Sequence, residues 1–145
     1  MKELSDYDII KYCQQHHIKL NHIYSRDQLP KVLPIGFYIF NLNKADQSGS
    51  HWTASSISPN GNFYCDSFGF MAFQELEDRI KPYYYNTKVL QDERSSSCGW
   101  WCMMFLKFIQ ENGNSKHSFK EFLSLFTDKP TMNEHILENW FENLH

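Results

Sequence analysis

A chain of 145 residues with 41% hydrophobic and 17% aromatic residues is not intrinsically disordered, because it has enough apolar side chains to form a core. Its net charge of −3 argues against a strongly basic nucleic-acid binder, and no apolar run reaches the roughly 20 residues of a membrane span. Since the N-terminus also lacks a signal-peptide pattern, we expect one domain over residues 1–145 that is neither membrane-inserted nor secreted.

The first half of the chain predicts a helix, a turn and three strands. Ser5 is the expected N-cap of a helix over residues 5–17, in which apolar residues recur at helical spacing. Two prolines and a glycine within 29–36 indicate a turn that leads into the first strand. Aromatic and β-branched residues then predict strands at 36–42, 50–58 and 62–68. Pro-Asn-Gly at 59–61 predicts a hairpin between the last two.

The second half is mostly helical. A helix over residues 73–82 ends near a proline, residues 83–91 are expected to form a fourth strand, and Cys98 opens the next helix. Two further helices are expected to start with capping boxes, formed by the pairs Ser118–Glu121 and Thr131–Glu134. This order of elements predicts an α+β fold with a mostly antiparallel central sheet packed against helices.

Cys98 is the candidate nucleophile because it stands between the polar run 94–97 and an apolar helix. The partial positive charge of a helix N-terminus favours the thiolate, which is the reactive form of a cysteine. Gly99, directly after it, is expected to let a substrate backbone approach closely. With no secretion signal, we expect all four cysteines to be reduced: Cys13, Cys65, Cys98 and Cys102.

A nucleophilic thiol needs a base, and His51 is the candidate because it alone of seven histidines lies in a strand-like run. The hairpin is expected to place position 51 near position 70, with Asp66 closer to the turn and able to orient His51. Gln91, at the end of the expected fourth strand, is the candidate to form an oxyanion hole with the Cys98 backbone N–H.

Two tryptophans flank these candidates. Trp52 is expected to pack beside His51, to shield it from water and to contribute to substrate binding. Trp100 is expected either in the core or in a narrow slot that admits glycine residues of a substrate. A zinc site is disfavoured, because the Cys and His residues at 13–17 and the pair Cys98–Cys102 do not match the short Cys-x-x-Cys loops of structural zinc sites.

The ordered set of Ser-His-Trp at 50–52, Cys-Asp-Ser-Phe-Gly-Phe at 65–70, Gln91 and the Cys-Gly at 98–99 resembles the adenovirus-type cysteine proteases, or adenains. These are related to the SUMO and ubiquitin-like proteases. The resemblance extends from about residue 5 to 110 and implies a papain-like-superfamily fold of this type. It also implies the roles of the site residues: His51 is the general base, Asp66 orients it, Gln91 stabilises the oxyanion and Cys98 is the nucleophile.

The resemblance further implies a viral capsid-maturation protease that cleaves virion precursor polypeptides at Gly-containing sites. It implies action without a cofactor, in the host cytoplasm or nucleus and in the virion. The short chain is similar to compact members encoded by virophages, Polinton-like elements or other large DNA viruses. Adenains carry glutamate where Asp66 stands, and no cysteine lies between Asp66 and Cys98 to tether an activating peptide through a disulfide. An activating peptide remains open, and the net acidic charge argues against stimulation by DNA.

Three alternatives remain at this stage. The same residues would serve an isopeptidase that removes ubiquitin-like modifiers, or a thiol acetyltransferase. The chain would alternatively be a catalytically inactive relative that binds capsid proteins or Gly-rich tails.

Overall fold

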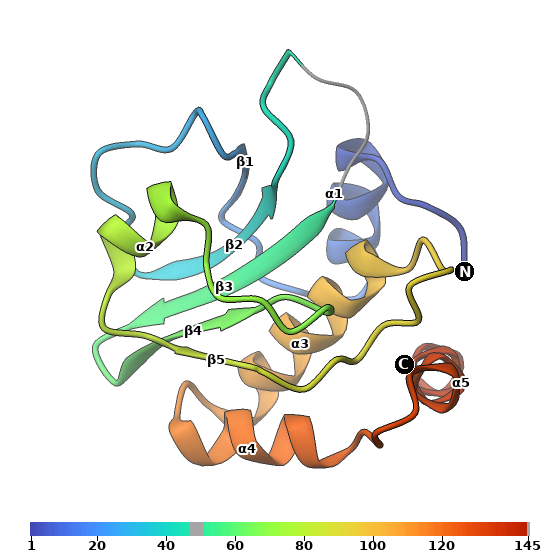
Figure 1. Ribbon diagram of the computed structural model, residues 1–145. Coiled ribbons are helices and arrows are strands. Elements are labelled where there is room, and N and C mark those ends of the chain that lie inside the picture. The colour runs from blue at the N-terminus through green and yellow to red at the C-terminus, as the bar shows by residue number, and fades with distance from the viewer. Residues whose placement is uncertain (47–50, 145) are drawn as a thin grey trace.

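A central sheet organises the molecule (Figure 1). In the computed structural model, which describes residues 1–46 and 51–144, the sheet has five strands that neighbour one another in chain order: β1 (His22–Ser25), β2 (Gly36–Asn41), β3 (Trp52–Ser58), β4 (Gly61–Cys65) and β5 (Tyr84–Tyr85). The central pairs β2–β3 and β3–β4 are antiparallel, and the outer pairs β1–β2 and β4–β5 are parallel. The predicted α+β class is confirmed, with a sheet that is mixed.

The helices divide between the two faces of this sheet (Figure 1). One face packs against α3 (Cys98–Asn112), which also contacts α1 (Asp6–Gln15), α4 (Lys116–Ser124) and α5 (Pro130–Glu142). The other face packs against α2 (Gln74–Ile80). Strand β2 serves both faces because successive side chains point in opposite directions: Phe37 and Ile39 join the α3 core, whereas Tyr38 and Phe40 join the α2 core.

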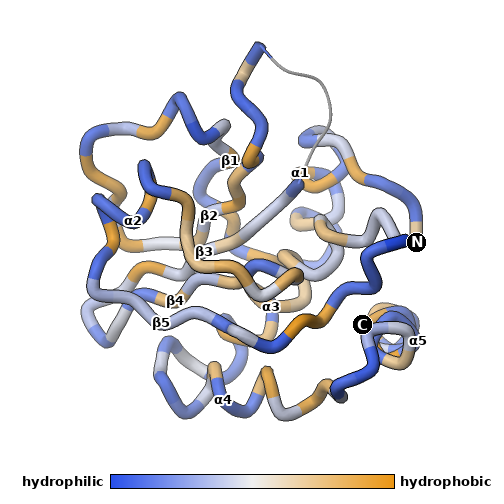
Figure 2. Tube along the Cα trace, viewed as in Figure 1, coloured by the Kyte–Doolittle hydropathy of each residue, from blue (hydrophilic) through white to orange (hydrophobic). Residues whose placement is uncertain are grey.

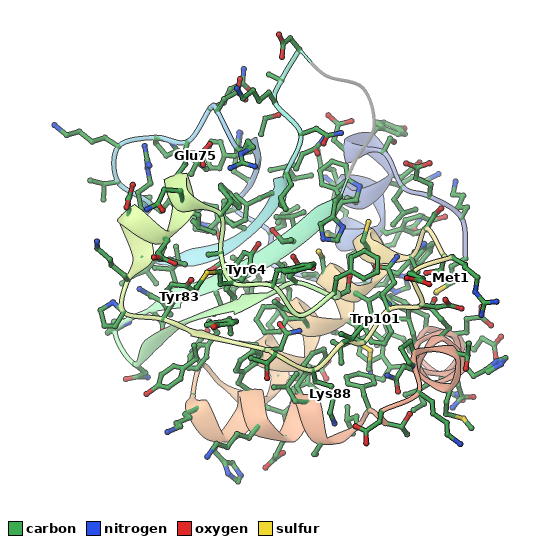
Figure 3. The ribbon with its side chains drawn as sticks, viewed as in Figure 1. Met1, Tyr64, Glu75, Tyr83, Lys88 and Trp101 are labelled. Carbon is green, nitrogen blue, oxygen red and sulfur yellow. The ribbon has the colours of Figure 1, made fainter. Side chains whose placement is uncertain are left out.

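Helix α3 is the most deeply buried helix, because the sheet and three helices surround it. Trp101, Met103 and Phe105 have no exposed surface, and the Trp101 ring lies between α3 and α5 (Figure 3). Hydrophobic residues gather along the strands and α3, while hydrophilic residues dominate the outer loops (Figure 2). Among the described residues, no helix combines the length and apolar character that crossing a membrane requires.

Several predicted helix boundaries need correction. Ser5 caps α1 as predicted, but α1 ends at Gln15 and not at residue 17. The Ser118–Glu121 capping box is wrong, since Ser115 caps α4 by accepting a hydrogen bond from the Ser118 N–H. The Thr131–Glu134 box is also wrong, because α5 already begins at Pro130, whose fixed φ suits a first helical turn.

The edge strand β1 was missed in the sequence. Its four residues lie partly or fully exposed and pair only with β2, in parallel. They show no alternation of buried and exposed positions, so the sequence carries no strand signal there.

The hairpin between β3 and β4 has a tighter turn than predicted. Ser58 pairs with Gly61, which leaves only residues 59 and 60 in the turn. Ala54 pairs with Cys65, and continuing this register places position 51 opposite Phe68 and not opposite position 70. The predicted start of the strand at Ser50 lies outside the described residues.

The predicted strand at 83–91 is mostly wrong, because the chain leaves the sheet after Tyr85. At the next position the side chain of Asn86, and not its backbone, makes the hydrogen bonds to the neighbouring chain. Its Oδ1 accepts from the Asp66 N–H, and its Nδ2 donates to the Asp66 carbonyl at 2.6 Å. Lys88 then anchors the segment to the end of α4 (Figure 3), where its Nζ donates to the carbonyls of Leu123 and Phe126. Gln91 therefore lies in a loop.

Candidate active site

His51 and Asp66 meet because they lie at neighbouring ends of two paired strands. His51 directly precedes β3 and Asp66 directly follows β4. Their side chains form a hydrogen bond of 2.9 Å between His51 Nε2 and Asp66 Oδ1. Because an ionised carboxylate only accepts hydrogen bonds, this contact assigns the Nε2 proton to histidine and leaves Nδ1 for another partner.

Asp66 is held firmly from both its side chain and its backbone. It is 1% exposed, and its Oδ1 also accepts a hydrogen bond of 2.8 Å from the Phe68 N–H. The Asn86 side chain also binds the backbone N–H and the backbone carbonyl of Asp66, which fixes the main chain on both sides of the Asp66 Cα. The carboxylate thus has little freedom to turn away from His51.

The His51 ring makes a stacking contact and has a raised pKa. The Phe68 ring stacks on it, with centroids 5.1 Å apart and an interplanar angle of 30°. Burial lowers the pKa of His51, but the side-chain hydrogen bonds with Asp66 and Cys98, together with their negative charges, outweigh this and raise the pKa to about 9. The imidazole is therefore set to hold a proton near neutral pH.

Cys98 is the first residue of α3, as predicted, and its side chain reaches His51 and Trp52. The thiol is one of the neighbours that raise the pKa of His51, and its Sγ accepts the Trp52 N–H at 3.5 Å. The Trp52 ring is buried, and its Nε1 donates to the Leu4 carbonyl at 3.0 Å. The Cys98 sulfur thus lies at the N-terminus of α3 and beside the backbone at the start of β3.

The other three thiols lie in apolar surroundings. Burial raises the pKa of Cys13 to about 12, and it raises the pKa of Cys65 and of Cys102 well above the ordinary value. These thiols stay protonated near neutral pH. Within residues 1–46 and 51–144, no group of three or more His, Cys, Asp or Glu side chains is placed to hold a metal ion.

Gln91 is buried, and its amide is oriented by two contacts. Its Oε1 accepts the Ser67 hydroxyl at 2.6 Å, and its Nε2 donates to the Ser95 carbonyl at 3.1 Å. Since a carbonyl can only accept, the Ser95 contact fixes which end of the amide carries the hydrogens. Ser67 directly follows Asp66, so the glutamine is connected to the same strand end as the His51–Asp66 pair.

Gly99 and Trp100 face the N-terminal segment. A Cβ on Gly99 would lie 3.2 Å from Leu4 Cδ1 and 3.4 Å from Trp52 Cδ1, so close packing alone accounts for the glycine. Trp100 Nε1 donates to the Lys2 carbonyl, and the indole packs against Tyr12 and Phe141. None of these contacts joins Trp100 to the His51–Asp66–Cys98 group.

Four residues around the site were not singled out from the sequence: Ser67, Phe68, Asn86 and Glu134. Ser67 and Phe68 lie within the motif at 65–70, and their position beside Asp66 was a usable signal. Asn86 and Glu134 gave no signal for a role at the site, because Asn86 binds Asp66, 20 residues away, and the partners of Glu134 lie 33 to 42 residues away in the chain.

Comparison with known proteins gives one relative. No family model matches the sequence. A protease of bovine adenovirus C serotype 10 is 28% identical over 116 residues, which cover 66% of this chain and 54% of that protease. The chain thus spans about half the length of the curated relative that it matches. This relative supports the adenain-like family assignment that the motifs around His51, Asp66 and Cys98 indicated.

Proposed function

We propose that this chain is a cysteine endopeptidase in which His51, Asp66 and Cys98 form the catalytic triad. The observation that carries the proposal is the hydrogen bond of 2.9 Å between His51 and Asp66, with the Cys98 thiol at the start of α3 as the second neighbour that acts on the histidine. A base that is oriented by a third group and touches a thiol at a helix N-terminus is the arrangement that activates a cysteine nucleophile. The similarity to an adenovirus protease agrees with this reading.

The reaction begins from the form in which the Cys98 proton already rests on His51 Nδ1, which agrees with the raised pKa of this histidine. The thiolate attacks a peptide carbonyl, a C–S bond forms, and the carbonyl oxygen becomes an oxyanion. We assign the second Nε2 hydrogen of Gln91 and the Cys98 backbone N–H to that oxyanion, because Ser95 uses only one hydrogen of the amide.

Collapse of this intermediate breaks the C–N bond. The protonated His51 gives its proton to the leaving amine, which is a task that suits a histidine whose pKa is raised to about 9. Water then attacks the thioester with His51 as base, and the free acid and the thiol are regenerated. Asp66 keeps the imidazole in the tautomer that faces sulfur throughout.

The proposed substrates are virion precursor polypeptides, cleaved at Gly-containing sites in the infected host cell and the virion. The adenovirus origin of the relative supports a viral substrate. Peptide libraries with Gly-Gly and Gly-X sequences test this, and C-terminally labelled ubiquitin-like proteins distinguish an isopeptidase.

The experiment that tests the activity compares Cys98→Ala with Cys102→Ala. Both remove a thiol from α3, but only Cys98 contacts His51. We expect Cys98→Ala to keep the circular dichroism spectrum and to abolish peptide cleavage, while Cys102→Ala keeps activity at a temperature at which it is folded. Cleavage by Cys98→Ala above a few per cent of the wild-type rate would falsify the proposal. A wild-type protein that cleaves no library peptide counts against it as well.

A further inference from the structure

We propose that Glu134 on α5 is a positioning residue for the oxyanion side of the site, an inference that rests on the proposed function. Its carboxylate accepts four hydrogen bonds from the segment that ends in the first turn of α3. Oε1 accepts from Ser97 Oγ at 2.7 Å, and Oε2 accepts from Asp92 N at 3.0 Å, Ser95 Oγ at 3.3 Å and Trp101 Nε1 at 3.3 Å.

These contacts enclose the loop that connects the two oxyanion donors. Asp92 directly follows Gln91, and Ser97 directly precedes Cys98. One carboxylate therefore holds both ends of the loop 92–97. Between them, the Ser95 hydroxyl shares its single hydrogen between the Asp92 carbonyl at 2.8 Å and Glu134 Oε2 at 3.3 Å, and the Ser95 carbonyl accepts from Gln91 Nε2. A shift of Glu134 is thereby transmitted to the Gln91 amide.

Glu134 also changes what Ser97 does. Ser97 is the N-cap residue of α3, and a serine at this position ordinarily accepts a hydrogen bond from a backbone N–H of the first turn. Here its side chain makes no capping bond and donates to Glu134. The N–H groups at the start of α3 thus remain uncovered by this hydroxyl, and their partial positive charge is available to an oxyanion.

The geometry favours a carboxylate at position 134. All four partners are donors, and an ionised carboxylate supplies only acceptors. Hydrogen bonds to an ionised acceptor are also the stronger kind. A glutamine in its place would turn an NH₂ group toward at least one of these donors, so part of the loop would lose its support.

The experiment compares Glu134→Gln with Glu138→Gln, one helical turn further along α5. Glu138 is a matched control, because its carboxylate is 48% exposed and pairs with the N-terminal amine at 3.8 Å. For a Gly-containing peptide, we expect Glu134→Gln to lower kcat about 10- to 100-fold with KM within about threefold, since small misplacements of catalytic groups cost rates of this order. Glu138→Gln is expected to stay within about twofold of wild type.

A second measurement separates positioning from loss of structure. Alkylation of Cys98 by iodoacetamide uses the same thiolate but forms no oxyanion. We therefore expect the alkylation rate of Glu134→Gln to change less than about threefold while kcat falls. In the double variant with Gln91→Ala, the effect of Glu134→Gln should largely disappear, because it acts through the glutamine loop.

The inference is overturned if Glu134→Gln keeps kcat within twofold of wild type, if only KM changes, or if alkylation falls as much as kcat. Should Glu134→Gln fail to fold, Ser97→Ala removes the shortest of the four contacts alone; unchanged kcat in that variant overturns the inference too. An active wild type with an unaffected Glu134→Gln defeats this inference alone. An inactive wild type defeats the proposed function with it.

Discussion

His51 and Asp66 are held by the ends of two paired strands, whereas Gln91 and Cys98 are joined by a loop that depends on a remote helix. The first pair is separated by 15 residues and closed by a two-residue turn. In the second pair, Gln91 accepts a hydrogen bond from Ser67. The loop that follows Gln91 binds Glu134, which lies up to 42 residues away along the chain.

The difference shows which parts of the site are locally determined. Once the β3–β4 register forms, the acid–base pair follows from it, because backbone pairing fixes both strand ends. The loop between Gln91 and Cys98 also depends on α5, because Glu134 accepts hydrogen bonds from both of its ends. Substitutions on the two sides should therefore affect different steps and different observables.

The largest expected effect on the loop side comes from Gln91→Ala. It removes the proposed oxyanion donor but leaves His51 and Cys98 in contact, so we expect kcat to fall about 10²- to 10³-fold, as for other oxyanion-hole donors. Steady-state kinetics with a Gly-containing peptide measure this. The control is the alkylation rate of Cys98, which should change little. A kcat within threefold of wild type would remove Gln91 from the mechanism.

A smaller effect is expected on the strand side from Asp66→Asn. The asparagine oxygen can still accept from His51 Nε2 and the Phe68 N–H, so the geometry is kept and only the charge is lost. We expect kcat to fall about 10- to 100-fold. Because the Asp66 contact raises the pKa of His51, the variant should have a lower histidine pKa than the value of about 9 in the wild type.

The pH dependence of Asp66→Asn gives the sharper test. Protonated His51 is needed to protonate the leaving amine, so wild-type kcat/KM should decline as pH rises past about 9, and the decline should begin at lower pH in the variant. Stability follows the same sign: the folded-state pKa lies above the ordinary 6.5, so the contribution of the pair is complete below that pH and is lost as pH rises through 9. Identical alkaline limbs in both proteins would contradict the assigned role.

The smallest effect is expected from Trp100→Phe, which touches neither side of the site. Phenylalanine keeps the ring packing against Tyr12 and Phe141 but loses the hydrogen bond to the Lys2 carbonyl. We expect kcat/KM within about twofold of wild type and an unfolding free energy lower by about 1 kcal/mol. Peptide kinetics and urea denaturation measure these. A tenfold rise in KM would instead support the prediction that Trp100 lines a substrate-binding slot.

Much of the fold was accessible from the sequence because strong local signals mark it. Ser5 caps α1 as predicted, and the change from a polar run to an apolar one marked Cys98 as the start of α3. The weak signals failed. The four-residue β1 has no alternation of buried and exposed residues. The strand expected at 83–91 is only two residues long, because beyond it the side chain of Asn86 takes over the hydrogen bonds to Asp66.

The sequence by itself predicted the α+β class, which the structure confirms, and it supplied the candidate residues of the proposed site, because reactive side chains stand at recognisable strand and helix ends. Tertiary structure alone decided the hairpin register, the packing of Trp100 against the N-terminal segment and the redirection of Glu134 from a helix cap to the loop before Cys98. Local propensity can predict a cap within four residues. Whether a carboxylate instead meets donors some forty residues away depends on how helices dock, which is set by core packing as a whole.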